Sequence, residues 1–253
     1  MVAGSGSLFE QQFGIPPAVG YFLLVALVIL TTILRTERIV TIISYISPYM
    51  IALALIVVVY SLFTSGMNFE ELDNVAHDQL SAAPHWLLSA LLYVSFNFSV
   101  GFAMMAVIGS TEKNKQAARR GAIVGGIILG VMVLVLNLGI YANIDQLQDA
   151  EMPTLALATE ISPLVGILMA IALLGMIFNT ATAMFYSFTA RFVQAETPKF
   201  RGAVVIVGIV AFALGFIGFV DLVNTVYPML GYVGFVLIGA VLVSLLRSRN
   251  KNH

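Results

Sequence analysis

The chain of 253 residues contains no cysteine, and only 10% of its residues are charged. Without cysteine it can form neither a disulfide nor a thiolate nucleophile. A soluble domain carries roughly 25% charged residues, so the scarcity of charge argues against an ordinary water-soluble protein. The apolar share of 60% and the mean hydropathy of +0.98 indicate an integral membrane protein instead.

Reactive groups are equally scarce. The chain has three histidines, and no His, Asp, Glu, Lys or Arg falls in the middle of an apolar run, where such residues mark proton relays and charge sensors. The sequence contains neither HExxH nor GxSxG, and it has no basic tract typical of nucleic-acid binding. We therefore expect no enzymatic activity, no metal site and no nucleic-acid partner. No cofactor is expected either, apart from Na⁺ as a coupling ion if the protein is an ion-driven transporter.

Seven apolar runs are present, each of roughly 18 to 25 residues, the length that crosses a bilayer as a helix. They are Pro17–Leu34, Val40–Phe63, Trp86–Ser110, Gly121–Tyr141, Pro163–Phe185, Gly202–Phe219 and Leu222–Leu246. The runs are apolar all round and lack the two-residue alternation of barrel strands. The sequence therefore predicts an all-α integral membrane protein with about seven transmembrane helices, as a single polytopic domain in contact with the lipid bilayer.

The connections between these runs alternate in charge. One set carries all 12 basic residues, and the other carries none of them and 10 of the 13 acids. The basic residues are Arg35, Arg38, Lys113, Lys115, Arg119, Arg120, Arg191, Lys199, Arg201, Arg247, Arg249 and Lys251. Because cytoplasmic loops are enriched in Lys and Arg, the pattern predicts a multi-pass protein of the cell membrane with a cytoplasmic C-terminus.

Two further segments bear on the helix count. The opening residues MVAGSGS read as the last turns of a helix, which predicts an N-terminal helix remnant and an N-terminally incomplete chain. The connection 142–162 contains EMPTLALATEISP, in which Pro153 suits the first turn of a short outer helix. A plain solvated loop is the alternative for this stretch.

Two helix pairs invite an internal comparison. The runs 17–34 and 40–63 can be laid on 202–219 and 222–246, with Pro48 and Pro228 at matching places in the second helix of each pair. The pairs enter the membrane from opposite sides, as in the inverted repeats of many secondary transporters. On this interpretation residues 1–63 end a first repeat, and residues 86–246 form the second.

The run Trp86–Ser110 gathers polar residues at its centre, in YVSFNFSVGF. An asparagine at membrane depth needs a partner, so we expect this stretch to be enclosed by protein or locally unwound. A break there would expose carbonyls to a solute cavity, which makes a candidate substrate site of Ser95, Phe96, Asn97, Phe98 and Ser99. The alternative is a continuous helix that uses its serines and glycine for close packing and Asn97 for an interhelical hydrogen bond.

A second polar cluster occurs in IFNTATAMFYSF, within the run 163–185 and just beyond it. Hydroxyl and amide oxygens suit a hard monovalent cation, so Asn179, Thr180 and Thr182 are candidate ion ligands. The alternative is hydrogen bonding to carbonyls of their own helix or to a neighbouring helix. The small-residue spacings at 121, 125, 126 and 130 predict close packing of that run inside the bundle, with a dimer face as the alternative.

The run MVAGSGSLFEQQFGIPP and the segments YVSFNFSV, MPTLALATEISPLVGIL and IFNTATAMFYSFTAR together resemble the YkvI-like membrane proteins. That group is identified as a bacterial branch of the amino acid–polyamine–organocation superfamily, which has the LeuT-type fold of five plus five inverted helices. The resemblance implies that the chain lacks the first two helices and most of the third. It also implies that Trp86–Ser110 is the sixth helix of the fold, one of two broken helices that hold substrate.

The same resemblance places Pro163–Phe185 as the eighth helix, in which sodium-coupled members carry a pair of hydroxyl ligands. Asn179 and Thr180 occupy the matching positions, and an asparagine there departs from the pattern, which leaves sodium coupling open. The sequence thus favours a secondary active transporter, in symporter form if sodium drives it, of a small solute such as an amino acid. The alternatives are a seven-helix receptor-like protein and a structural membrane protein without transport activity.

Overall fold

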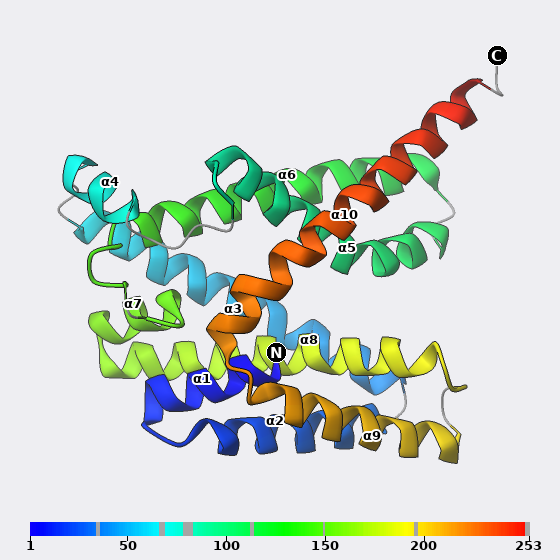
Figure 1. Ribbon diagram of the computed structural model, residues 1–253, viewed down its shortest axis with the longest axis horizontal. Coiled ribbons are helices and arrows are strands. Elements are labelled where there is room, and N and C mark those ends of the chain that lie inside the picture. Colours follow the sequence, from blue (N-terminus) through cyan, green and yellow to red (C-terminus); the bar gives the residue numbers. More distant parts are fainter. Residues whose placement is uncertain are drawn as a thin grey trace. The chain divides into compact units, whose positions relative to one another are not determined.

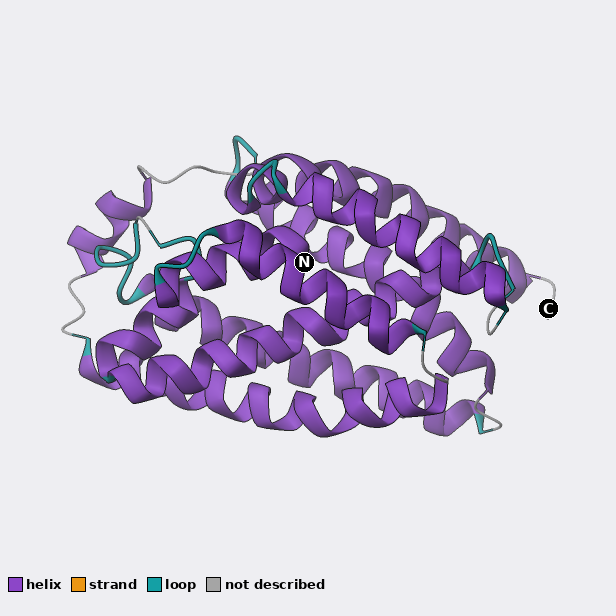
Figure 2. Cartoon of the chain, turned by 90° about the horizontal axis from the view of Figure 1, so that it is seen from below, coloured by secondary structure: helices purple, strands orange, loops and turns teal. Residues whose placement is uncertain are grey.

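The computed structural model describes residues 1–33, 36–65, 69–77, 83–111, 114–148, 150–194 and 197–250. These ranges contain ten helices and no strand (Figures 1 and 2), which confirms the all-α prediction. The helices are α1 (Val2–Phe13), α2 (Pro17–Thr32), α3 (Thr36–Thr64), α4 (Phe69–His77), α5 (Trp86–Thr111), α6 (Lys115–Tyr141), α7 (Pro153–Ile161), α8 (Pro163–Ala190), α9 (Pro198–Gly215) and α10 (Phe219–Asn250).

Each of the seven apolar runs is helical, with ends that differ from the prediction by a few residues. They correspond to α2, α3, α5, α6, α8, α9 and α10. Four of these helices, α6, α8, α9 and α10, are long and apolar enough to cross a membrane in full. Shorter apolar helical stretches lie at Pro17–Thr32, Pro48–Thr64 and Trp86–Phe102. The chain is therefore a multi-pass membrane protein.

Of the three short helices, α1 and α7 were predicted and α4 was not. α1 confirms a helix over the opening residues but continues to Phe13, beyond the predicted MVAGSGS. Gly14 caps it with a φ of 64°, a left-handed conformation that glycine adopts without strain. α7 confirms the short helix that begins at Pro153 and rules out a plain loop over 153–161. α4 was not predicted, because this short helix contains several acidic residues and no long apolar run that would indicate a helix.

The chain divides into two compact units, of which the first comprises residues 1–78 and 132–219. Within it, α2, α8 and α9 run side by side, and α1 packs against all three (Figure 1). α2 buries one face, at positions spaced three or four residues apart, because side chains with that spacing lie on the same side of a helix. Its core partners include Ala181 and Phe185 on α8 and Val2 on α1. A second cluster joins α3, α7 and α8 around Val58, Leu155 and Met169.

α1 and α2 approach closely at glycines. A Cβ placed on Gly20 would lie 2.6 Å from the carbonyl oxygen of Ser5 and 2.9 Å from the Cα of Gly6. In lipid, burial of apolar surface adds little to helix association, so close packing of this kind is a main source of stability. Backbone atoms cannot move aside as a flexible side chain can.

We therefore expect Gly20→Ala to lower the free energy of unfolding by about 1–3 kcal/mol through overpacking. The matched control is Gly202→Ala in α9, where a new Cβ would meet nothing within 4 Å. That change should raise stability by about 0.5–1 kcal/mol, because alanine favours the helix over glycine. Thermal unfolding of the purified protein in detergent, followed by circular dichroism, measures both. Shifts of the same sign would contradict the close approach of α1 and α2.

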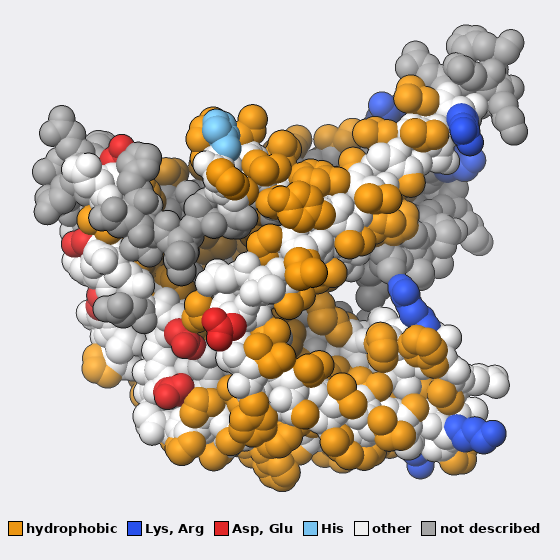
Figure 3. Space-filling view, viewed as in Figure 1, with side chains coloured by type: hydrophobic (Ala, Val, Ile, Leu, Met, Phe, Trp, Pro, Cys, Tyr) orange, Lys and Arg blue, Asp and Glu red, His pale blue; other side chains and the backbone are white. Residues whose placement is uncertain are grey.

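Charge is segregated along the helices of this first unit. The acids Glu10 and Glu160 lie on α1 and α7, directly before α2 and α8 begin. The bases Arg191 and Lys199 flank the connection from α8 to α9, at the opposite end of α8. Figure 3 shows hydrophobic side chains covering the exposed sides of α2 and α9 between these ends. This is the surface expected of helices that contact lipid along their length and water at their ends.

The second unit comprises residues 79–131 and 220–253, with α5, the first part of α6 and α10. In this part of α6, a Cβ placed on Gly121, Gly125, Gly126 or Gly130 would meet no described atom within 4 Å. The prediction that these glycines pack inside the bundle is therefore wrong for the described residues. The large side chains between them, such as Ile127 and Leu129, are exposed too among the described residues of this unit. The dimer face stays a prediction.

Candidate functional site

The polar centre of α5 does not interrupt the helix. The backbone is α-helical from Trp86 to Thr111, so the predicted break over Ser95–Ser99 is wrong. The physical reason is that the polar side chains find acceptors without unwinding. The Asn97 Nδ2 donates to the carbonyl oxygen of Tyr93 over 2.8 Å, and the Ser99 hydroxyl donates to that of Phe96 over 2.8 Å. Such bonds to the preceding turn satisfy polar side chains within their own helix.

Ser95 instead joins α5 to α10. It is fully buried, and its hydroxyl donates to the carbonyl oxygen of Gly231 over 2.6 Å. Two glycines permit this approach: a Cβ on Gly231 would lie 2.9 Å from the carbonyl oxygen of Leu92, and a Cβ on Gly234 would collide with the carbonyl oxygen and the hydroxyl of Ser95. Ser95 therefore packs against α10, as the alternative of a continuous helix predicted for the serines, but the interhelical hydrogen bond is made by Ser95 and not by Asn97.

A cavity of about 190 Å³ lies beside this contact, within the second unit. It has room for roughly six water molecules at about 30 Å³ each. On one wall the Phe96 ring stacks on Tyr227, with ring centroids 4.2 Å apart and planes 18° apart. The lining residues come from α5 and α10 alone and are Ser89, Leu92, Tyr93, Phe96, Val223, Asn224, Tyr227 and Pro228.

Pro228 changes the chemistry of this cavity. α10 continues through Pro228, and proline has no backbone N–H. The carbonyl of Asn224, four residues earlier, therefore lacks its usual helical donor, and both residues line the cavity. The cavity thus offers a backbone acceptor, the Asn224 amide and the hydroxyls of Ser89, Tyr93 and Tyr227 beside two stacked rings. That set can hold a small solute with polar groups at one end and an apolar part at the other.

The structure separates the five candidate substrate residues. Ser95 and Phe96 face α10, whereas Asn97 is exposed and Phe98 packs near Phe102, with ring centroids 5.5 Å apart. Ser99 is half-buried and bonded within α5. The inference that Asn97 must be enclosed by protein is wrong, because its amide is satisfied by its own helix.

Sequence reasoning missed the α10 side of the cavity altogether. The available signal was Pro228 with an asparagine four residues before it: a proline in an apolar helix frees one carbonyl, and Asn224 supplies that carbonyl. Pro228 entered the sequence argument only as a repeat marker. Tyr227, which stacks on Phe96, had no distinguishing pattern, since aromatic residues are frequent throughout these helices.

The candidate ion ligands lie on α8, in the first unit. Thr182 is 1% exposed, and its hydroxyl donates to the carbonyl oxygen of Phe178 over 2.8 Å, which leaves its lone pairs as acceptors. Asn179, about one turn before Thr182, and Thr180, two residues before it, are half-buried. Among the described residues, no group of three or more His, Cys, Asp or Glu side chains could hold a metal ion. A role for the α8 residues in ion binding stays a prediction.

Comparison with known proteins gives one distant relationship. The chain is homologous to "Uncharacterized membrane protein YkvI" of Bacillus subtilis (strain 168), with 25% identity over 246 residues. The match covers 96% of this chain and 68% of that protein. No protein-family model matches the chain, and no solved structure matches it. These findings support a membrane protein related to YkvI, and the superfamily remains a prediction.

Proposed function

We propose that this membrane protein is a secondary transporter that carries a small polar solute, such as an amino acid, by alternating access. The observation that supports this most is the cavity between α5 and α10. Hydroxyls, an amide and the carbonyl that Pro228 leaves without its helical donor line this cavity between two apolar helices. Polar groups on membrane helices are costly to leave against lipid, and a polar solute can bond to them while it passes.

The cavity also sets the kind of solute. About 190 Å³ is below the usual range for drug-sized ligands, so the solute is small. The Phe96 and Tyr227 rings offer an apolar wall, and Asn224 offers an amide together with its carbonyl. An amino acid has an ammonium group that can donate a hydrogen bond to the Asn224 carbonyl. It also has a side chain that can pack against the Phe96 and Tyr227 rings.

The remaining parts of the proposal follow from the sequence. Helices α2 and α3 form the end of one inverted repeat and α9 and α10 belong to the other, within the LeuT-type superfamily. Positively charged connections lie in the cytoplasm together with the C-terminus. Asn179, Thr180 and Thr182 hold Na⁺ if the transport is sodium-coupled. The proline in α10 is the point at which that helix flexes as access alternates.

Uptake into proteoliposomes tests the proposal. The purified protein is reconstituted into liposomes and supplied with labelled amino acids, with and without a sodium gradient. We expect uptake of at least one of them. Phe96→Ala should lower the rate about tenfold, since it removes one wall of stacked rings.

The control is Phe98→Ala, two residues along the same helix and outside the cavity lining. It should change the rate by less than about twofold, because nothing that contacts the solute is lost. Absence of uptake of every amino acid tested, or equal losses for the two variants, would speak against transport through the α5–α10 cavity. A protein that binds solute without moving it would point to the receptor-like alternative.

A further inference from the structure

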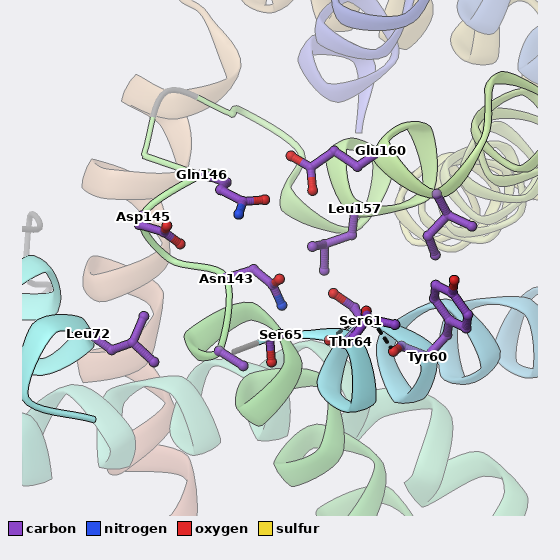
Figure 4. A pocket seen from close by; sticks show the side chains of 12 residues that line it. Tyr60, Ser61, Thr64, Ser65, Leu72, Asn143, Asp145, Gln146, Leu157 and Glu160 are labelled. Atoms are coloured by element: carbon purple, nitrogen blue, oxygen red, sulfur yellow. Dashed lines mark hydrogen bonds between the residues drawn. The ribbon is translucent and has the colours of Figure 1, made fainter. Parts of the chain in front are cut away.

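A larger cavity lies in the first unit, away from every residue that the sequence marked as a candidate ligand. It has a volume of about 430 Å³ and opens where α3 and α7 end and where the chain leaves α6 (Figure 4). Its lining residues are Tyr60, Ser61, Thr64, Ser65, Leu72, Ala142, Asn143, Asp145, Gln146, Leu157, Glu160 and Ile161.

The charges at the wall of this cavity are all negative. Three helices, α3, α6 and α7, finish at its wall, and the C-terminal end of a helix carries a partial negative charge of about half an elementary charge. The carboxylates of Asp145 and Glu160 add two full negative charges. No Lys, Arg or His occurs among the described lining residues. Nothing at the wall therefore balances this negative potential.

Two buried polar side chains face the cavity with unused capacity. Ser61 is 5% exposed and Asn143 is 7% exposed. The Asn143 Nδ2 donates to the carbonyl oxygen of Gly139 over 2.8 Å, which fixes the amide and leaves its oxygen as an acceptor. Within the described part of the chain, neither that oxygen nor the Ser61 hydroxyl has a hydrogen-bond partner. Both residues line the cavity, so a ligand that donates hydrogen bonds can reach these two oxygens.

The lining residues also indicate which kind of cation fits this cavity. A bare divalent ion needs several oxygens close together at fixed distances, and no cluster of three carboxylate or histidine side chains exists among the described residues. The space is also much larger than a metal ion requires. Leu157 and Ile161 supply an apolar patch for methylene groups, and the Tyr60 ring lines the same space.

We propose that this cavity is a binding site for a small organic ammonium ion, such as an aliphatic amine or diamine. The ammonium groups donate to the carboxylates of Asp145 and Glu160 and to the Ser61 and Asn143 oxygens, and the carbon chain lies against Leu157 and Ile161. The site is distinct from the α5–α10 cavity, and the proposal does not depend on transport.

Calorimetric titration of the purified protein in detergent at low ionic strength tests this site, with 1,4-diaminobutane as the probe. We expect saturable binding that weakens as salt is added, because exposed carboxylates are screened. The neutral analogue 1,4-butanediol has nearly the same shape and should not bind. Asp145→Asn combined with Glu160→Gln should raise the dissociation constant about tenfold, as expected for the loss of a charge-assisted hydrogen bond. Ser61→Ala should raise it about threefold.

The matched control is Glu151→Gln, an exposed acid on the same connection that does not line the cavity. It should leave the dissociation constant within about twofold. Equal weakening by this variant would show a diffuse charge effect and overturn the site, and so would binding of the diol. Calcium chloride that binds more tightly than the diamine and displaces it would overturn the ligand class in favour of a metal. Failure of amino-acid uptake leaves this titration unaffected, so the two proposals fail separately.

Discussion

Replacing Gly234 by leucine is expected to force α5 away from α10 and to lower the free energy of unfolding by about 3 kcal/mol or more. Even a single Cβ at this position would collide with the carbonyl oxygen and the hydroxyl of Ser95. The obstacle includes backbone, so relief requires movement of a whole helix rather than a new rotamer. That movement also breaks the hydrogen bond from Ser95 to Gly231, which leaves a buried hydroxyl without a partner.

Thermal unfolding in detergent measures this effect, with Gly239→Leu as the control on the same helix. A Cβ on Gly239 would meet nothing within 4 Å, so leucine should be tolerated there and should add about 1 kcal/mol of helix propensity. A further variant, Ser95→Ala, separates the two causes, because it removes the hydrogen bond without adding volume. If Gly234→Leu and Gly239→Leu unfolded at the same temperature, the close contact of α5 and α10 would be refuted.

The fold was predictable wherever a long apolar run decides the structure. All seven runs are helices, because each leaves the backbone no partner in lipid other than itself. α7 was open to two interpretations and α4 was missed, since short helices at the membrane surface depend on tertiary contacts more than on a pattern. Leu72 shows this dependence: it is 5% exposed within a helix otherwise rich in acids.

The candidate site was predictable only in part. The polar centre of α5 drew attention to Ser95 and Phe96, and both face α10. The expected break failed because a serine or asparagine can bond to a carbonyl three or four residues back at no cost in backbone geometry. Composition alone cannot distinguish a helix that unwinds to bind a ligand from a continuous helix whose polar side chains hydrogen-bond to its own backbone. The second cavity could not be predicted from the sequence, because Ser61, Asn143 and Glu160 lie far apart along the chain and come together only in the fold.

Pro228→Ala is expected to stabilise the protein while it abolishes most of the transport. Alanine restores the backbone N–H that proline lacks, so the carbonyl of Asn224 regains its helical donor. The gain in unfolding free energy should be about 1–3 kcal/mol, since proline costs about 3 kcal/mol relative to alanine in a helix interior. Uptake should fall about a hundredfold, because the charged solute loses a carbonyl acceptor worth about 1.5–3 kcal/mol and α10 loses its point of flexion.

Pro48→Ala in α3 is the comparison that isolates this effect. Pro48 is also internal to its helix, so its replacement should stabilise by a similar amount, yet Pro48 lines neither of the two cavities. Uptake by that variant should stay within about threefold of the unmodified protein. If Pro228→Ala alone gains stability and loses uptake, Pro228 serves transport. Replacing a proline that only holds the structure together would lower stability and uptake together. Unchanged uptake by Pro228→Ala would mean that the solute does not use the Asn224 carbonyl, and the α5–α10 cavity would then lose its role in transport.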